Sequence, residues 1–468
     1  MPAGLAIIVV AQFVLFLRIR KTGMDFDEGF YLASLDALRH GQAMGTQVFL
    51  PQPPGFYELM RLAGALVGPS AEQVREAFVA LAAVGGLGLF ALARGLGAGF
   101  AALIAPALLI ITPPVPEDAA RVWADLPCLW VALVALGLAA LAARRGRGEL
   151  VLAGLAGVVA VAAVTVKFPA ALIGPVVLVL LAAAPGWRMR VSAGIAGAAA
   201  ATVVFFVAYW PALGDLWRSN IVYHSRAANT PPVLNRRYEL EKLFDPKTPY
   251  FWLLLAGGLA VVVALVQRRA RAGELALWCW AGVSFLFLLW FSPLHYNHLV
   301  YLPVPLAAAA SVSLGRALAR PSRWRAAGTV VVALALAAGW VQQLHRVDLA
   351  SAPNAAVDVA AAAVLDRSTQ PSDYVVTDLP VAGVLAHRVV PGPLVELGNL
   401  RFVTRLVTPA IVLKDVDSYC VQAVVAGRAF RQQPVLLAGL KTRFNRVVKV
   451  LSADIYLDPR QTCRRSAE

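Results

Sequence analysis

The feature that most constrains this chain is its series of long apolar stretches. There are about eleven of them, each of roughly 16 to 22 residues, and about 20 apolar residues in a helix cross a bilayer core of about 30 Å. Only 15% of the 468 residues are charged and the mean hydropathy is +0.68, which excludes a soluble globular protein. Because open backbone cannot face lipid, the stretches must be helices. The expected spans run over residues 3–17, 73–93, 97–112, 123–142, 150–165, 168–184, 191–209, 250–267, 274–291, 299–318 and 326–343.

One further apolar segment is not expected to cross. Residues 53–69, "PPGFYELMRLAGALVGP", open with two prolines and carry Glu58 and Arg61 internally. Charged side chains are costly inside a bilayer. We therefore interpret this segment as a half-buried or interfacial piece.

The distribution of arginines predicts the orientation in the membrane. The formal net charge of +15 would suggest a nucleic-acid partner in a soluble chain, but here the arginines gather in alternate short loops, which the positive-inside rule makes cytoplasmic. The N-terminus is then inside, and everything after about residue 344 is outside. The clusters are Arg94; Arg144, Arg145 and Arg147; Arg188 and Arg190; Arg268, Arg269 and Arg271; and Arg316, Arg320, Arg323 and Arg325.

Three cations break this pattern. Arg18, Arg20 and Lys21 lie on the predicted outer side, directly before a cluster of acids. The first span is also short and has no positive flank before it, so the start is truncated or the helix sits shallowly. A cleaved signal peptide is disfavoured because no basic n-region or small-residue cleavage site is evident.

The composition changes after residue 344. Residues 1–344 are expected to form the transmembrane domain, and residues 345–468 a small extracytoplasmic α/β domain with its own core. "DYVVTD" and "VQAVVAG" are typical of buried strands, "PVAGVLAHR" and "QPVLLAGLKTRF" of helices, and "VVKVLSADIYLD" of one or two later strands. Cys420 and Cys463 lie in this oxidising region, where a disulfide between them is one alternative. Cys128 and Cys279 are expected to be apolar fillers within spans.

The chemistry is expected in the outer loops, which are residues 18–72, 113–122, 210–249 and 292–298 and a short turn at Lys167. The first of these contains "GMDFDEGFYLASLDALRHG", which predicts an amphipathic helix in the membrane interface. Helix capping explains one of its acids. Three acids at a bilayer surface are costly unless paired, which favours a functional role. They are Asp25, Asp27 and Glu28.

The second outer loop and the Lys167 turn hold further ionisable residues. Glu117, Asp118, Arg121 and Asp125 precede or begin the fourth span. An ionisable residue at a span edge points by default into a polar cavity, whereas an Arg121–Asp125 pair would only neutralise itself. Lys167 either snorkels to the interface or contacts a phosphate.

The later outer loops mix aromatic and cationic side chains. Such a mixture suits stacking on sugars and gripping phosphates, but a loop near anionic head groups would look the same. The turn "SPLHYNHLVYLPVP" contains two histidines three residues apart, and belt residues are the simpler interpretation of its tyrosines. No Cys/His spacing indicates a zinc site, so we expect no protein metal site and leave a divalent cation open. The residues are Trp217, Tyr223, His224, Arg226, Arg236 and Arg237, and then His295, Tyr296, His298 and Tyr301.

The order of these features resembles the integral-membrane glycosyltransferases of the GT-C class. An Asp-Glu pair follows the first span, and then come a Pro-Pro helix, an arginine-bearing second span, a second acidic loop and a late "Y-x-x-P-x-P" turn. The resemblance is greatest to the bacterial protein mannosyltransferase and aminoarabinose transferase superfamily and covers nearly all of the chain. It implies a GT-C fold with about eleven transmembrane helices.

The resemblance also implies site residues. It makes Asp27 the catalytic carboxylate with Glu28 beside it, and Asp125 the second acidic position. Gln52 stands where some members have lysine, and His295 stands where arginine is more common before Tyr296. Other cations, such as Lys21 or Lys167, are therefore expected to contact the phosphate. The implied substrate-binding and lipid-phosphate-binding residues are Arg75, Lys167, Lys21, Gln52, Tyr57, Arg121, His295, Tyr296 and Tyr301.

The resemblance implies transfer of a sugar from a polyprenyl-phosphate donor to an acceptor hydroxyl, outside the cytoplasmic (inner) membrane of a bacterial cell envelope. A carboxylate serves as general base, and cations stabilise the departing phosphate. The partners are this donor, a glycan, lipid or protein acceptor and membrane lipid, with no nucleic acid. A transporter or flippase of lipid-linked sugars is the alternative, and a catalytically dead scaffold is the third. The sequence names neither the sugar nor the acceptor.

Overall fold

The chain forms two compact units in a computed structural model. The structure describes residues 2–18, 22–144, 146, 148–228, 236–320, 324–350 and 352–459. Unit 1 comprises Met1–Lys21, Leu62–Tyr209 and Pro231–Ser351, and unit 2 comprises Thr22–Arg61, Trp210–Thr230 and Ala352–Glu468. Parts of two outer loops, residues 22–61 and 210–230, thus belong to the same unit as the C-terminal domain, whereas the sequence led us to expect two successive domains.

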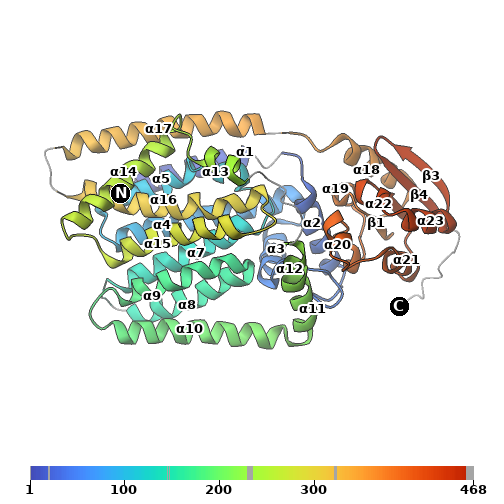
Figure 1. Cartoon of the computed structure of the whole chain (residues 1–468), viewed down its shortest axis with the longest axis horizontal. Coiled ribbons are helices and arrows are strands. Elements are labelled where there is room, and N and C mark those ends of the chain that lie inside the picture. Colours follow the sequence, from blue (N-terminus) through green and yellow to red (C-terminus); the bar gives the residue numbers. More distant parts are fainter. Residues whose placement is uncertain are drawn as a thin grey trace. The chain divides into compact units, whose positions relative to one another are not determined.

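Unit 1 is helical, and its long helices run side by side (Figure 1). Within the described residues, eight helical segments are long and apolar enough to cross a membrane, and three apolar ones are shorter. Each expected span coincides with one of them, so the polytopic prediction is confirmed. The elements are α1 (Pro2–Arg18), α4 (Ala71–Gly95), η2 (Gly99–Leu103), α5 (Ile104–Ile110), α6 (Val115–Asp118), α7 (Asp125–Ala142), α8 (Glu149–Val166), η3 (Phe168–Ile173), α9 (Gly174–Ala182), α10 (Trp187–Ala208), α13 (Arg236–Leu243), α14 (Pro249–Val266), α15 (Ala272–Trp290), η6 (Tyr296–Tyr301), α16 (Pro303–Ala319) and α17 (Arg325–Ala350).

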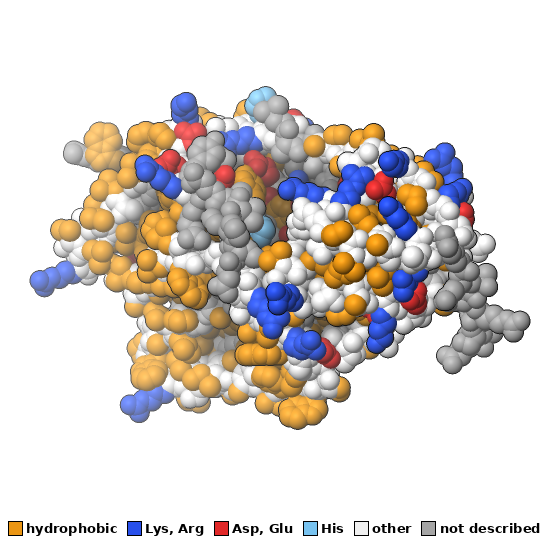
Figure 2. Space-filling model, turned by 45° about the vertical axis from the view of Figure 1, so that its right-hand side comes forward, with side chains coloured by type: hydrophobic (Ala, Val, Ile, Leu, Met, Phe, Trp, Pro, Cys, Tyr) orange, Lys and Arg blue, Asp and Glu red, His pale blue; other side chains and the backbone are white. Residues whose placement is uncertain are grey.

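Small residues let the helices of unit 1 approach closely. A Cβ on Gly88 of α4 would lie 2.7 Å from the Leu133 carbonyl oxygen of α7, and one on Gly137 would lie 2.5 Å from the Gly88 carbonyl oxygen. Helices in lipid associate through such close packing, because lipid tails are as apolar as the side chains and no hydrophobic effect drives the helices together. The outer faces keep large exposed apolar side chains, such as Val203, Val204 and Val207 of α10, Leu259 and Val266 of α14, and Val331 and Leu334 of α17. Figure 2 shows hydrophobic side chains in orange over much of the visible surface.

Unit 2 combines loop-borne helices with a small sheet. Its sheet has the order β1-β2-β4-β3, in which β1 is parallel to β2 and the other pairs are antiparallel. The expected strands and helices of the C-terminal domain are present, which confirms its α/β class. The elements are α2 (Phe26–Arg39), the first part of α3 (Pro54–Val67), η4 (Trp210–Ala212), α11 (Leu213–Trp217), the π-helix η5 (Arg218–Val222), α12 (Tyr223–Ala227), α18 (Ala356–Ser368), β1 (Val375–Thr377), α19 (Pro380–Leu385), η7 (Gly392–Leu394), α20 (Asn399–Val403), α21 (Pro409–Ser418), β2 (Ala423–Ala426), α22 (Arg428–Arg431), α23 (Pro434–Arg443), β3 (Phe444–Val450) and β4 (Ala453–Pro459).

Helix α2 is a core element of unit 2, so its predicted place in the membrane interface is wrong. Its side chains from Glu28 to Leu35 are all buried, including polar Ser34. A Cβ on Gly29 would lie 2.7 Å from the backbone nitrogen of Val381 in α19. The small residue therefore lets α19 pack closely against one face of α2. On another face, the Tyr31 side chain packs against Phe56 of α3 instead of lipid.

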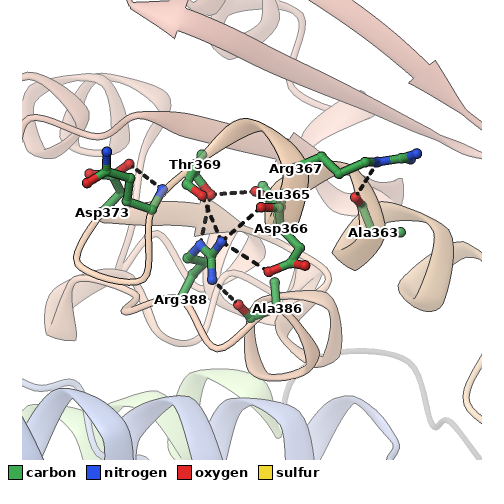
Figure 3. A network of polar contacts seen from close by, with 9 residues as sticks. Ala363, Leu365, Asp366, Arg367, Thr369, Asp373, Ala386 and Arg388 are labelled. Atoms are coloured by element: carbon green, nitrogen blue, oxygen red, sulfur yellow. Dashed lines mark hydrogen bonds and ion pairs between the residues drawn. The ribbon is translucent and has the colours of Figure 1, made fainter.

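A buried arginine joins two helices of the C-terminal part of unit 2. Arg388, which follows α19, donates hydrogen bonds to the Thr369 carbonyl oxygen at 2.7 Å and to Asp366 Oδ1 at 3.3 Å (Figure 3). It also donates to the Ala386 carbonyl oxygen. Because a buried guanidinium must be satisfied to be tolerated, this network ties the end of α18 to the segment after α19.

The structure also refines several expectations. The 210–249 loop contains helices, and α17 continues to Ala350, beyond the expected domain boundary. Within the segment 53–69, which was expected to be half-buried or interfacial, residues 54–67 form helix α3. Cys128 is buried and Cys279 is exposed on α15. Cys420 is disulfide-bonded, and Cys463 lies outside the described residues.

Candidate active site

The three acids at the start of α2, Asp25, Asp27 and Glu28, have different structural positions. Asp25 is the N-cap, and its Oδ1 accepts a hydrogen bond of 2.9 Å from the backbone N–H of Glu28. Asp25 is therefore the one acid of the three that helix capping was expected to explain. Glu28 is fully buried, whereas Asp27 is half-buried in the first helical turn. Among the three acids, Asp27 is the one that is partly exposed and is not the N-cap residue.

Besides burial, the charge of Asp27 raises the pKa of two buried tyrosines, Tyr57 and Tyr223. Burial raises the pKa of Tyr57 well above its usual value, and the negative charges of Glu396 and Asp27 raise it further. Burial, Glu396 and Asp27 also raise the pKa of Tyr223. These effects come from α2, α3, α12 and the C-terminal domain, all within unit 2. Asp27 thus lies close to a buried polar cluster that includes a second carboxyl.

Glu396 is the buried carboxyl of this cluster. Its Oε1 accepts a hydrogen bond of 3.0 Å from the Gly398 backbone N–H, whereas its Oε2 has no hydrogen-bond partner among the described residues. Burial raises the pKa of Glu396 to about 7, although the Arg401 cation and the Gly398 hydrogen bond act in the opposite direction. Glu396 therefore titrates near neutral pH.

This titration predicts a pH-dependent stability. Between its usual pKa of 4.5 and its folded pKa of about 7, Glu396 keeps its proton in the folded state and loses it in the unfolded state. Folding stability from this residue is complete at lower pH and is lost as the pH rises to about 7, on the order of 3 kcal/mol in all. We expect the thermal midpoint of the detergent-solubilised protein to fall from about pH 5 to about pH 8 less steeply in Glu396→Gln than in wild type.

Glu58→Gln is the matched control, because Glu58 lies in the same unit but is 44% exposed and pairs with Arg61. Other buried carboxyls, such as Asp358, contribute in the same direction, so only the difference between the variants isolates Glu396. Equal slopes in wild type and Glu396→Gln would show that Glu396 does not titrate in this range.

Gln52 and Tyr57 support the helix that carries Asp27. Gln52 donates a hydrogen bond of 2.9 Å from Nε2 to the Tyr31 hydroxyl of α2. The Tyr31 ring also packs edge-on against Phe56, with centroids 4.8 Å apart, and lies near Tyr57. Gln52 and Tyr57 therefore order the aromatic surroundings of α2, and neither supplies a cation for a phosphate.

Unit 1 holds a second polar cluster, built around Asp125 and Lys167. Lys167 Nζ donates to Asp125 Oδ2 at 2.8 Å, and both side chains are at most 8% exposed. The Tyr301 hydroxyl adjoins Asp125 and lies 3.4 Å from Cys128 Sγ. Burial and then the Lys167 cation lower the pKa of His295, so its imidazole is neutral at neutral pH. The structure thus brings Asp125, Lys167, Tyr301 and His295 together.

Other predicted site residues also lie in unit 1. Arg75 is buried in α4 at 2% exposure. Arg121 lies over the Trp123 ring at 5.1 Å from its centroid, and Tyr296 lies in the electrostatic range of Glu117 and Asp118. Arg18 forms an ion pair of 3.0 Å with Asp348, so it is paired within unit 1. Lys21 and Arg20 lie outside the described residues.

Two residues of the 210–249 loop, His224 and Arg226, make contacts within unit 2. His224 Nε2 lies 2.7 Å from the Pro51 carbonyl oxygen, and Arg226 donates to the Thr404 carbonyl oxygen at 3.0 Å. Trp217 is 61% exposed, and Arg237 pairs with Glu241. Within the described part of the chain, no group of three or more His, Cys, Asp and Glu side chains could hold a metal ion.

Comparison with solved structures identifies the fold. The crystal structure of ArnT from Cupriavidus metallidurans bound to undecaprenyl phosphate matches with a TM-score of 0.68 at 14% identity, covering 97% of both chains. The chain has the GT-C fold. Residues 51–210 also match the model of the dolichyl-phosphate-mannose-protein mannosyltransferase family. A comparison with proteins of curated function found no match.

Two further GT-C structures are similar. AglB from Archaeoglobus fulgidus, in complex with an inhibitory peptide and a dolichol-phosphate, matches with a TM-score of 0.57 at 14% identity, covering 97% of this chain and 74% of that one. Arabinofuranosyltransferase AftD from Mycobacteria matches with a TM-score of 0.58 at 14% identity, covering 98% of this chain and 40% of that one. The fold that the motif resemblance implies is therefore confirmed.

Sequence reasoning missed two residues of this GT-C chain, Glu396 and Arg401. A signal was present, because Glu396 is the only acid between Asp378 and Asp415 and stands in the apolar run "PLVELG". An ionisable residue in such surroundings is a candidate for a perturbed pKa. The distance of about 370 residues from Asp27 concealed that they share one cluster.

Proposed function

We propose that this GT-C chain transfers a sugar from a polyprenyl-phosphate-linked donor to an acceptor hydroxyl on the extracytoplasmic side of the membrane. The observation that carries the proposal is the match over 97% of both chains to a fold solved with undecaprenyl phosphate. A lipid-linked donor also suits a chain with many apolar helices, because the lipid tail requires a site that opens to the bilayer.

In this proposal Asp27 is the general base. Its carboxylate removes the proton of the acceptor hydroxyl while the hydroxyl oxygen attacks the anomeric carbon and the bond to the phosphate oxygen breaks. Partial exposure lets an acceptor reach Asp27, and the Asp25 cap holds the first turn of α2 in place. Glu28 is fully buried, so it supports the position of Asp27 rather than contacting substrate.

Lys167 is proposed to bind the donor phosphate. An ammonium has three N–H donors, and the Asp125 contact uses one of them, which leaves donors for phosphate oxygens. Such a cation stabilises the leaving group as negative charge develops on it. Asp125 then acts through Lys167 and is a positioning residue, not the second catalytic carboxylate that the resemblance implies. Tyr301 and neutral His295 complete the polar surroundings.

The proposal is tested with purified protein and a panel of radiolabelled polyprenyl-phosphate sugars, using a bacterial cell-envelope fraction as acceptor. The expected result is transfer of label from the lipid-extractable donor to the acceptor, with release of polyprenyl phosphate. Protein that binds the donor but leaves its glycosidic bond intact with every sugar in the panel would contradict the enzyme assignment.

The alternative function is transport of lipid-linked sugars. It predicts movement of an intact labelled donor across a proteoliposome membrane without bond cleavage. The sequence shows neither a repeat of hydropathy in two halves nor matching broken spans, and the transferase is therefore preferred.

A further inference from the structure

A pocket in unit 2 is not used by the reaction as described above. It has a volume of about 170 Å³ and is formed by the 45–49 segment, the α11–η5 region and the segment from Pro393 to Leu406. This volume exceeds the space needed for a few waters and is below that of drug-sized sites. It suits one sugar ring or one small anionic group.

The pocket wall contains a buried arginine with an unused edge. Arg401 is 6% exposed and donates from Nη1 to the carbonyl oxygens of Pro393, at 2.6 Å, and Glu396, at 2.8 Å. Its guanidinium carbon lies 3.9 Å from the centroid of the Phe49 ring, which also lines the pocket. Among the described residues, Nε has no hydrogen-bond partner, and Nη2 donates no hydrogen bond.

An unsatisfied buried donor costs about 1–3 kcal/mol, and the Nε and Nη2 edge of a guanidinium matches two oxygens of a carboxylate or phosphate. Two backbone carbonyls and an aromatic ring already fix the plane of Arg401, so little ordering remains for a ligand to impose. The arrangement is therefore preorganised for an anion.

The remaining lining residues suit the rest of such a ligand. Arg218 and Asp215 are exposed at the pocket, so its lining holds two arginines and one acid. Outside the lining, the charges of Glu396 and Asp415 also act on Arg401. Thr46 and Ser219 add hydroxyl groups, which hydrogen-bond with sugar hydroxyls. Besides burial, the charges of Arg401 and Asp27 both shift the pKa of Tyr223. The pocket wall and the proposed base therefore both lie within electrostatic range of Tyr223.

We propose that this pocket binds a sugar that carries an anionic group, a phosphate or a carboxylate, through the free edge of Arg401. If the proposed transferase function holds, this sugar belongs to the acceptor. The binding site itself does not depend on that function and is tested without turnover.

The test measures equilibrium binding of glucose 6-phosphate, glucuronate, inorganic phosphate and glucose to the full chain in detergent. Saturable binding of glucose 6-phosphate, of glucuronate or of both is expected, and their order assigns the phosphate or the carboxylate. Arg401→Lys keeps the positive charge but removes the planar guanidinium that can donate two parallel hydrogen bonds. We expect it to weaken binding at least about tenfold.

Because Arg401→Lys could lose binding through a folding defect, variants at the exposed edge of the pocket test the proposal independently. Both Arg218 and Asp215 are exposed, so their replacement leaves the fold intact. Arg218→Met should weaken anion binding about two- to fivefold and Asp215→Asn should strengthen it by a similar factor. Glucose binding as tight as glucose 6-phosphate, inorganic phosphate binding as tight as the sugar phosphate, or two edge variants without opposite effects would each overturn the proposal. Donor turnover in the absence of sugar binding would overturn this pocket assignment while leaving the transferase intact.

Discussion

Asp27→Asn should lower the turnover number for sugar transfer by about 10²- to 10⁴-fold, the usual contribution of a general base. Asparagine has nearly the same shape and forms the same helix turn, but its amide does not accept the proton of the acceptor hydroxyl. Donor binding should change little, because the proposed phosphate contacts lie in unit 1 on Lys167. The measurement is initial transfer rate and donor affinity, each with the radiolabelled donor.

Asp25→Asn is the matched control two residues away. Asp25 is the N-cap of α2, and asparagine caps helices about as well as aspartate, so this variant should retain activity within a few-fold. A folded Asp27→Asn protein that transfers sugar at the wild-type rate would refute the assignment of Asp27. A large loss in Asp25→Asn alone would move the assignment to Asp25.

Lys167→Met should destabilise unit 1 by about 3–5 kcal/mol, because it leaves the Asp125 charge buried without its partner. The two side chains are 8% and 1% exposed, with Nζ and Oδ2 2.8 Å apart. The double variant Asp125→Asn with Lys167→Met removes both charges and should be more stable than Lys167→Met alone. The measurement is the free energy of unfolding in a detergent titration, completed as a double-mutant cycle.

The ion pair of Arg18 and Asp348 provides the control. Its side chains are 46% and 57% exposed, and replacing Asp348 with asparagine should cost less than about 1 kcal/mol. If the effects of Asp125→Asn and Lys167→Met simply add, the two side chains do not interact energetically, and Asp125 is not positioning Lys167.

Much of the fold was predictable because its signals are local. Each span is a continuous apolar stretch, and the strands of the C-terminal domain are short apolar runs. The N-cap at Asp25 also follows from an acid directly before a helical pattern. The interfacial placement of α2 was wrong because amphipathic spacing alone does not say whether lipid or protein covers the apolar face. Here protein covers it, because Tyr31 packs against Phe56 of α3, while Gly29 on another face admits the backbone of α19.

The candidate site was only partly predictable for the same reason. Asp27, Asp125 and Lys167 stand out as ionisable residues in apolar surroundings, and the motif order indicated the class. The pairing of Asp125 with Lys167 across 42 positions depends on how α7 packs beside the segment after α8.

Hydropathy and capping act over a few neighbouring residues, so the amino-acid sequence suffices to predict a polytopic helical membrane protein, a C-terminal α/β domain and the acidic cluster at residues 25–28. Only the tertiary structure decided which groups share one environment. Glu396 and Arg401 come from the distant C-terminal domain, and their charges act on Tyr223, on which Asp27 also acts. Electrostatic coupling depends on distance in space and on burial, and neither is encoded in spacing along the chain.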